Sequence, residues 1–108
     1  MGKETRLTTK ELKKEISKIS DLYFLALKNY KRATISDSKR TINEYEKFIL
    51  RVRRAFSSLD SIDKELINND FFYQAYEDWW IKKYSRSTYY RLKARSMFRF
   101  KEAFDNED

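Results

Sequence analysis

The sequence has no cysteine, no histidine and no proline, and its one glycine is Gly2. Without cysteine there can be no disulfide and no thiolate metal site. Without histidine the chain also lacks the commonest general base and metal ligand. Glycine and proline are the usual residues of β-turns, so their scarcity argues against a sheet. We therefore expect an all-α fold, no metal ion, no cofactor and no enzymatic activity.

Long apolar stretches are missing as well. The run from Leu22 to Leu27 is a long one for this sequence, whereas a membrane span needs about 18 or more apolar residues. Residues 1–6 lack the apolar region of a signal peptide. We therefore expect a cytoplasmic protein that does not enter a membrane.

Charge is abundant but unevenly distributed. The net charge is +7, yet the charged residues of 60–78 are all acidic except Lys64, and no acidic residue occurs between 82 and 101. This second stretch is typical of a surface that binds a polyanion. The alternative is that the acidic segment simply pairs with the basic one. The eight basic residues are Lys82, Lys83, Arg86, Arg91, Lys93, Arg95, Arg99 and Lys101.

Residues 1–57 are predicted to form an antiparallel helical hairpin. Thr8 and Glu11 have the spacing of a capping box, which starts a helix at residue 9. Apolar residues then recur every three or four positions to about Arg32. Small polar residues at 33–38 predict a break, and Ser36 or Ser38 would cap a second helix with the same periodicity. A short connector between two helices favours an antiparallel pair.

Residues 58–108 are predicted to form three more helices, about five in all. The third spans about 59–68, with Leu59, Ile62 and Leu66 inward. The fourth, from about Phe71 or Phe72 to Lys82, is rich in aromatic residues. The fifth starts at an N-cap, Ser85, and one face of it should be buried. That face comprises Tyr89, Tyr90, Leu92, Ser96, Met97, Phe100, Ala103 and Phe104.

Residues 85–100 resemble the recognition helix of bacterial housekeeping sigma factors. The likeness lies in the serine and arginine at the start and in the register of Tyr89, Leu92, Ala94, Met97 and Phe100. Residues 84–93 are more similar still to phage late-transcription regulators of the ArpU type. Residues 59–67 resemble the first helix of the same helix-turn-helix, and the likeness covers about 55–104. It implies a sigma-like phage regulator of transcription that binds double-stranded DNA, with RNA polymerase as a further partner.

The resemblance also implies which residues contact DNA. In a helix-turn-helix the start of the second helix enters the major groove. Arg86, Ser87, Tyr90 and Arg91 occupy the base-reading positions, whereas Lys82, Lys83 and Arg95 occupy positions that contact phosphates. With the capping serine, the predicted DNA-binding residues are Lys82, Lys83, Ser85, Arg86, Ser87, Tyr90, Arg91 and Arg95.

Two other functions stay open at this point. The chain could be a helical adaptor that binds a protein and no nucleic acid, or an RNA-binding accessory protein that stacks bases on its aromatic rings. The hairpin could pack on the helix-turn-helix, form a homodimer, or bind RNA polymerase or a phage protein. Phe98 lies opposite the buried face of its helix, so either the hairpin or a second subunit should cover it.

Overall fold

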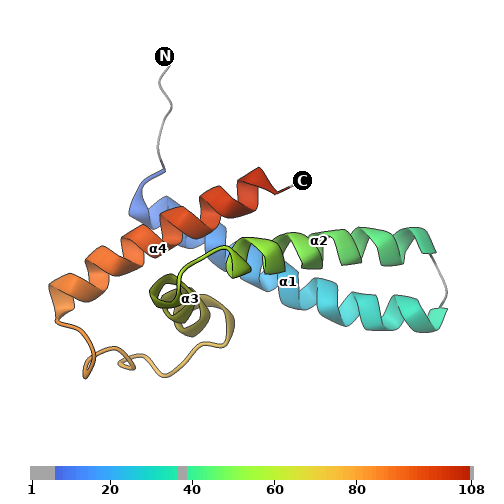
Figure 1. The fold of residues 1–108 in the computed structure, drawn as a ribbon. Helices are drawn as coiled ribbons and strands as arrows, with labels where there is room; N and C mark the ends of the chain where they lie inside the picture. Colours follow the sequence, from blue (N-terminus) through green and yellow to red (C-terminus); the bar gives the residue numbers. More distant parts are fainter. Residues whose placement is uncertain (1–6, 37–38, 108) are drawn as a thin grey trace, which may run out of the picture.

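The computed structural model describes residues 7–36 and 39–107, and Figure 1 shows how its helices are arranged. No β-strand occurs among these residues, and the all-α prediction is confirmed. Residues 7–36 and 39–107 contain four α-helices, where about five were predicted. The elements are α1 (Thr9–Ser36), α2 (Lys39–Ser57), α3 (Ser61–Ile67), a π-helical turn η1 (Asn68–Phe72) and α4 (Arg86–Asn106).

Helices α1 and α2 form the predicted antiparallel hairpin (Figure 1). At its start the Thr8 amide donates to Glu11 Oε1 at 2.8 Å, and the Glu11 amide donates to Thr8 Oγ1 at 3.1 Å, as the capping box requires. The break predicted at 33–38 is wrong in part, because α1 continues to Ser36. Neither proline nor glycine stops the helix there. Ser36 therefore ends α1 and does not cap α2, and Ser38 lies outside the described residues.

One core joins the hairpin to residues 58–108. Helix α1 contributes the stripe that its periodicity predicts, and Ile16 in that stripe is fully buried. The Ser20 hydroxyl donates to the Phe71 carbonyl at 2.6 Å and ties η1 to α1. The buried residues of this core are Leu12, Ile16, Ile19, Tyr23, Ala26, Ile49, Val52, Ala55, Leu59, Ile67, Phe71, Met97, Phe100 and Phe104.

The predicted fourth helix is wrong. Helix α3 runs directly into η1, residues 73–76 are irregular, and hydrogen-bonded turns at 77–83 lead towards the start of α4. The aromatic residues of this region pack in two separate clusters. Phe71 and Phe72 pack against α1, whereas Trp79 and Trp80 pack between α3 and α4. A single straight helix could not direct its side chains to both. The connection is therefore much longer than the turn of about three or four residues in a typical helix-turn-helix.

Ile62, predicted to point inward, is 42% exposed. The inward position is taken instead by Asp63, which follows it in α3 and is 1% exposed. Leu59 and Leu66 are buried as predicted. No helix within the described part of the chain combines the length and apolar character needed to cross a bilayer.

Candidate nucleic-acid interface

Helix α4 begins where the sequence predicts. Ser85 is extended, with φ −70° and ψ 161°, and its Oγ accepts from the Thr88 amide at 3.2 Å. The same hydroxyl donates to Thr88 Oγ1 at 2.9 Å. Because both interactions serve the cap, the predicted role of Ser85 at the interface is to hold the first turn of α4 in place.

We expect Ser85→Ala to lower the free energy of unfolding by about 1 kcal/mol, since it removes an acceptor from an otherwise unpaired helix amide. Urea denaturation followed by circular dichroism measures this loss. Ser87→Ala is the matched control, because Ser87 is exposed on the same turn and has no cap role. A Ser85→Ala variant as stable as the Ser87→Ala variant would contradict the importance of the cap.

Asp63 anchors α3 to α4 on one side of the basic helix. Its Oδ1 accepts from Ser96 Oγ at 2.6 Å and from Arg95 Nη2 at 3.1 Å, while Oδ2 accepts from Arg99 Nη1 at 2.9 Å. Burial by itself raises the pKa of Asp63, but the hydrogen bonds from Ser96, Arg99 and Arg95 outweigh it and hold this pKa below its usual value. Arg95, predicted to contact phosphate, is thus already held by a carboxylate.

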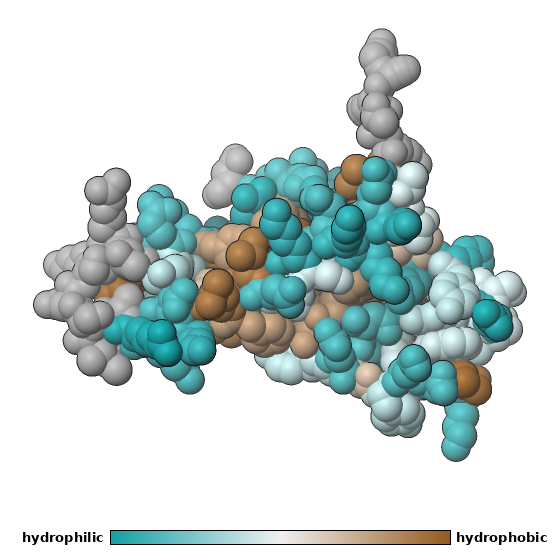
Figure 2. Space-filling view, turned by 180° about the vertical axis from the view of Figure 1, so that it is seen from behind, coloured by the Kyte–Doolittle hydropathy of each residue, from teal (hydrophilic) through white to brown (hydrophobic). Residues whose placement is uncertain are grey.

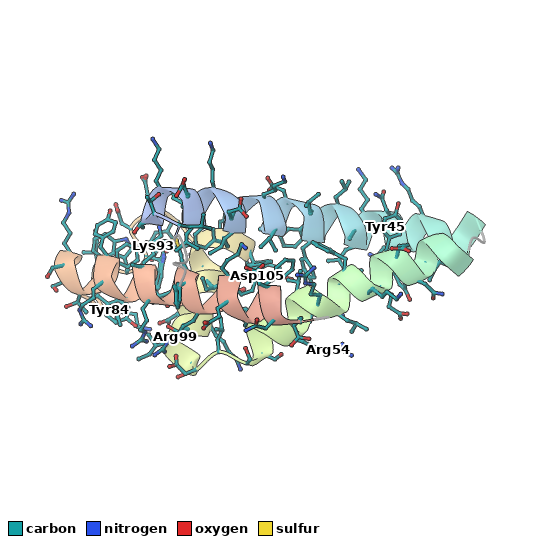
Figure 3. All side chains as sticks on the ribbon, turned by 90° about the horizontal axis from the view of Figure 1, so that it is seen from above. Tyr45, Arg54, Tyr84, Lys93, Arg99 and Asp105 are labelled. Carbon is teal, nitrogen blue, oxygen red and sulfur yellow. The ribbon has the colours of Figure 1, made fainter. Side chains whose placement is uncertain are left out.

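Asp70 has a similar role on the side of α4 that faces α1. It accepts from Trp79 Nε1 at 2.8 Å and from the Tyr89 hydroxyl at 2.6 Å, and Lys93 Nζ lies 3.4 Å away. Burial raises the pKa of Tyr89, and its hydrogen bond to Asp70 raises it further. The Trp80 ring stacks on Tyr89, with centroids 4.2 Å apart and planes inclined by 6°. Figure 3 shows Lys93 and Arg99 on opposite sides of α4.

Most of the basic residues at 82–101 are engaged in ion pairs. Lys83 pairs with Glu65 of α3, and the hydrogen bond that Lys83 donates to that carboxylate raises the pKa of Lys83. Lys101 pairs with Asp105 and, more distantly, with Glu15. Internal pairing of acidic and basic segments therefore explains much of the charge pattern. Within the described residues, the basic side chains of this stretch without an ion pair are Lys82, Arg86 and Arg91.

The four predicted base-reading residues lie together at the exposed start of α4. Arg86, Ser87 and Arg91 are exposed, and Tyr90 is 52% exposed although the sequence also placed it on the buried face. Tyr90 lies at the edge of that face, where its ring meets those of Trp80 and Tyr89 edge-on. Lys82, also exposed, precedes them. No side chain of this group is held in an ion pair among the described residues, whereas Lys83 and Arg95 are bound to carboxylates.

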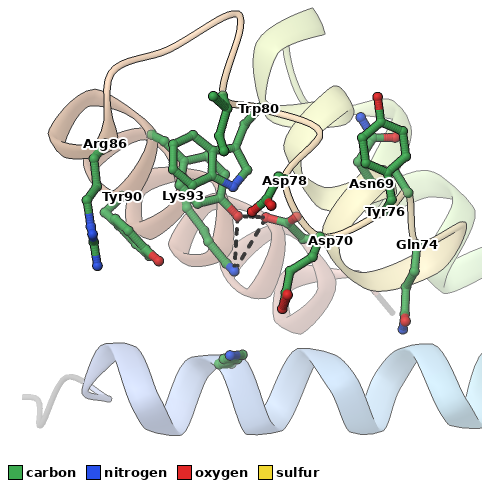
Figure 4. A pocket seen from close by; sticks show the side chains of 14 residues that line it. Asn69, Asp70, Gln74, Tyr76, Asp78, Trp80, Arg86, Tyr90 and Lys93 are labelled. Atoms are coloured by element: carbon green, nitrogen blue, oxygen red, sulfur yellow. Dashed lines mark hydrogen bonds and ion pairs between the residues drawn. The ribbon is translucent and has the colours of Figure 1, made fainter.

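An open groove of about 790 Å³ runs beside this group, between α1 and the segment that leads into α4 (Figure 4). Arg86 and Tyr90 lie on one side of the groove and extend towards α1, from which Lys13 contributes to the lining. Glu77 and Asp78 of the connecting segment also line it. The sequence does not indicate a role for Lys13, because nothing in the order of the residues shows that the first turns of α1 lie beside the start of α4.

The sequence also did not indicate that Asp63 and Asp70 each bind several side chains in the folded protein. A signal existed for Asp63, since it occurs in a helical register between buried Leu59 and Leu66. A charged residue in such a register requires a partner when the helix is packed. The identity of that partner depends on α4, which is more than thirty residues away.

Phe98 lies on the outward side of α4 and is 39% exposed. Among the described residues, the hairpin packs against Met97, Phe100 and Phe104 of α4. Cover of Phe98 by the hairpin or by a second subunit stays a prediction.

No family model, no curated protein and no solved structure matches this chain. The resemblance to sigma factors and ArpU-type regulators accordingly stays a prediction.

Proposed function

We propose that the protein is a DNA-binding regulator of transcription that places the start of α4 in the major groove of duplex DNA. The observation that carries the proposal is the exposed group of Arg86, Ser87, Tyr90 and Arg91 on one capped helix. Two of these residues are arginines without an ion pair among the described residues. A cytoplasmic location and a place among sigma-like phage regulators belong to the same proposal.

Arg91 is suited to read a base. It lies one turn into α4, with Ser87 four residues before it and Ala94 three residues after it, so small side chains flank it on its face of the helix. Small neighbours allow the helix backbone to approach the groove, and an arginine side chain can then reach a guanine edge with two hydrogen bonds. Helix α3, packed against α4 through Asp63, supports the reading helix as the first helix of a helix-turn-helix does.

Arg95 and Arg99 fit the proposal as pre-oriented phosphate contacts. Their side chains are 35% and 46% exposed even though both are bound to Asp63. A guanidinium has five N–H donors, so one that binds a carboxylate can still donate to a phosphate. Because Asp63 restricts both side chains beforehand, less conformational entropy is lost when DNA binds.

The test compares a site selected from random duplexes with unselected duplex. Arg91→Ala should reduce discrimination at one base pair by about 1–3 kcal/mol, because it removes a bidentate contact, and should cost much less on unselected DNA. Fluorescence anisotropy titrations on both duplexes measure this difference. For the wild type, about three or four phosphate contacts from the region of α4 should contribute roughly −3 to −4 to the log–log salt slope.

Lys82→Ala is the matched control, since it also removes one exposed positive charge near the start of α4. It should weaken binding to both duplexes equally and reduce the salt slope by about one. Equal losses on the two duplexes for Arg91→Ala would show that α4 binds charge without reading sequence. If the wild-type protein does not bind duplex at about 50 mM salt, the proposal fails altogether.

A second candidate function is protein binding through the hairpin, as an adaptor. Leu22 and Leu25 of α1 are 42% and 50% exposed, and they line an apolar groove with Tyr45 and Phe48 of α2. Exposed apolar groups of this kind are common at protein interfaces. Figure 2 shows an apolar patch surrounded by hydrophilic side chains on one face of the molecule. The partners predicted for the hairpin are RNA polymerase, a phage protein and a second copy of the chain.

A further inference from the structure

The start of α1 and the start of α4 lie on the two sides of one groove. Lys13, in the second turn of α1, lines the groove together with Arg86 and Tyr90 (Figure 4). These residues are more than seventy positions apart in the chain. The exposed group at the start of α4 therefore continues across the groove onto the hairpin.

The first turns of α1 carry cations that are available to a ligand. Lys10 and Lys13 are exposed, and neither forms an ion pair with any residue that the structure describes. They are three residues apart, which places them near each other on the helix surface. Glu11, the acidic residue between them, is bound to Thr8 in the capping box, and this hydrogen bonding lowers the pKa of Glu11.

The acidic residues that line the groove come from η1 and from the segment that connects it to α4. Asp70 is already occupied by Trp79, Tyr89 and Lys93. Glu77 and Asp78, in the connecting segment, have no ion pair among the described residues. The carboxylates of Glu77 and Asp78 would repel a polyanion, whereas the cations at the starts of α1 and α4 would attract it.

We propose that Lys10 and Lys13 form a second phosphate-binding surface, so that the DNA backbone is held between α1 and α4. This inference rests on the proposed function and gives the hairpin a direct part in it. The partner is a nucleic-acid backbone, because two separated lysines, one of them lining the open groove, suit a line of phosphates and make no bidentate, base-like contact. The contacts add affinity without sequence preference.

The experiment measures duplex binding by the full chain as a function of salt. The double variant Lys10→Ala/Lys13→Ala should lower the magnitude of the log–log slope by about two, since each lost phosphate contact contributes about 0.9. Its losses should be the same on selected and unselected duplex. A second double variant, Glu77→Gln/Asp78→Asn, should change affinity in the opposite direction, with binding several-fold tighter at low salt.

The matched control is Lys28→Ala/Lys31→Ala, which removes the same charge from exposed positions of the same helix. Lys28 and Lys31 lie about 22 Å and about 27 Å further along α1 than Lys13, at 1.5 Å per residue. This control should leave the slope nearly unchanged, because exposed charges beyond a Debye length of about 8–10 Å are largely screened.

The outcomes separate this inference from the proposed function. If the wild type binds duplex and Lys10→Ala/Lys13→Ala has the same slope as the control variant, the second surface does not exist although α4 binds DNA. If the wild type does not bind duplex, the proposed function itself has failed. If a poly-glutamate peptide competes as well as duplex of equal charge, the surface recognises acidic chains in general and the inference is overturned.

Discussion

Replacing Phe100 by alanine is expected to lower the free energy of unfolding by about 3–5 kcal/mol. Phe100 is fully buried. Its ring meets Phe72 edge-on, with centroids 5.8 Å apart, and stacks on Phe104, with centroids 6.4 Å apart. Truncation therefore removes a large apolar side chain and leaves a cavity where α4 meets the rest of the core. Urea denaturation followed by circular dichroism measures the loss.

Because the hairpin and residues 58–108 share this core, the Phe100→Ala variant should unfold in one transition. Such a loss is a large part of the total stability of a small domain, which is about 5–15 kcal/mol. Phe100→Leu, with a smaller expected loss, keeps the test usable if the alanine variant does not fold. Phe98→Ala is the matched control on the same helix and should have a much smaller effect, since Phe98 is 39% exposed. Separate transitions for the hairpin and for α3–α4 would contradict a shared core.

Replacing Asp63 by asparagine is expected to cost about 2–3 kcal/mol at neutral pH. Loss of one partner from a fully buried pair costs about 3–5 kcal/mol. The value here should be smaller, because the Arg95 and Arg99 side chains are partly exposed and can turn to water. Asp21→Asn is the control, since Asp21 is exposed and the charge change is the same.

The effect of Asp63→Asn should depend on pH. The pKa of Asp63 is lower in the folded protein than in the unfolded chain, where it is about 3.9. Its stabilising contribution is therefore present above that unfolded value and is lost as the pH falls through the folded pKa. The difference in stability between wild type and Asp63→Asn should shrink as the pH is lowered from about 5 to below 3. A difference that stays constant over this range would show that the carboxylate charge is not what anchors α3 to α4.

The sequence by itself determined the helical class, the capping box at Thr8 and the start of α4 at Ser85. These features are local, since a capping side chain bonds to an amide two or three residues away. The apolar stripe of α1 also follows from sequence alone, because the period of a helix decides which side chains share a face. With neither proline nor an internal glycine in the chain, few alternatives to a helix remained.

Only the tertiary structure decided the conformation of residues 73–85 and the availability of each cation. The sequence predicts a helix near Trp79 and Trp80, but their rings pack between α3 and α4 and hold the segment in turns. Local propensity yields to such burial because the packing of large aromatic side chains is worth more than a marginal helix.

In the candidate site, too, the sequence indicates which residues are basic, but the tertiary structure decides which of them are paired. Arg91 and Arg95 lie four residues apart on α4, and nothing in their local sequence distinguishes them. Arg95 meets the buried Asp63 across the interface of α3 and α4, whereas Arg91 meets no carboxylate among the described residues. Coulomb attraction depends on distance in space and on burial, neither of which the order of residues contains. Which positive charges are left for a ligand, and that Lys13 lies beside Arg86, were therefore decided by how the helices pack.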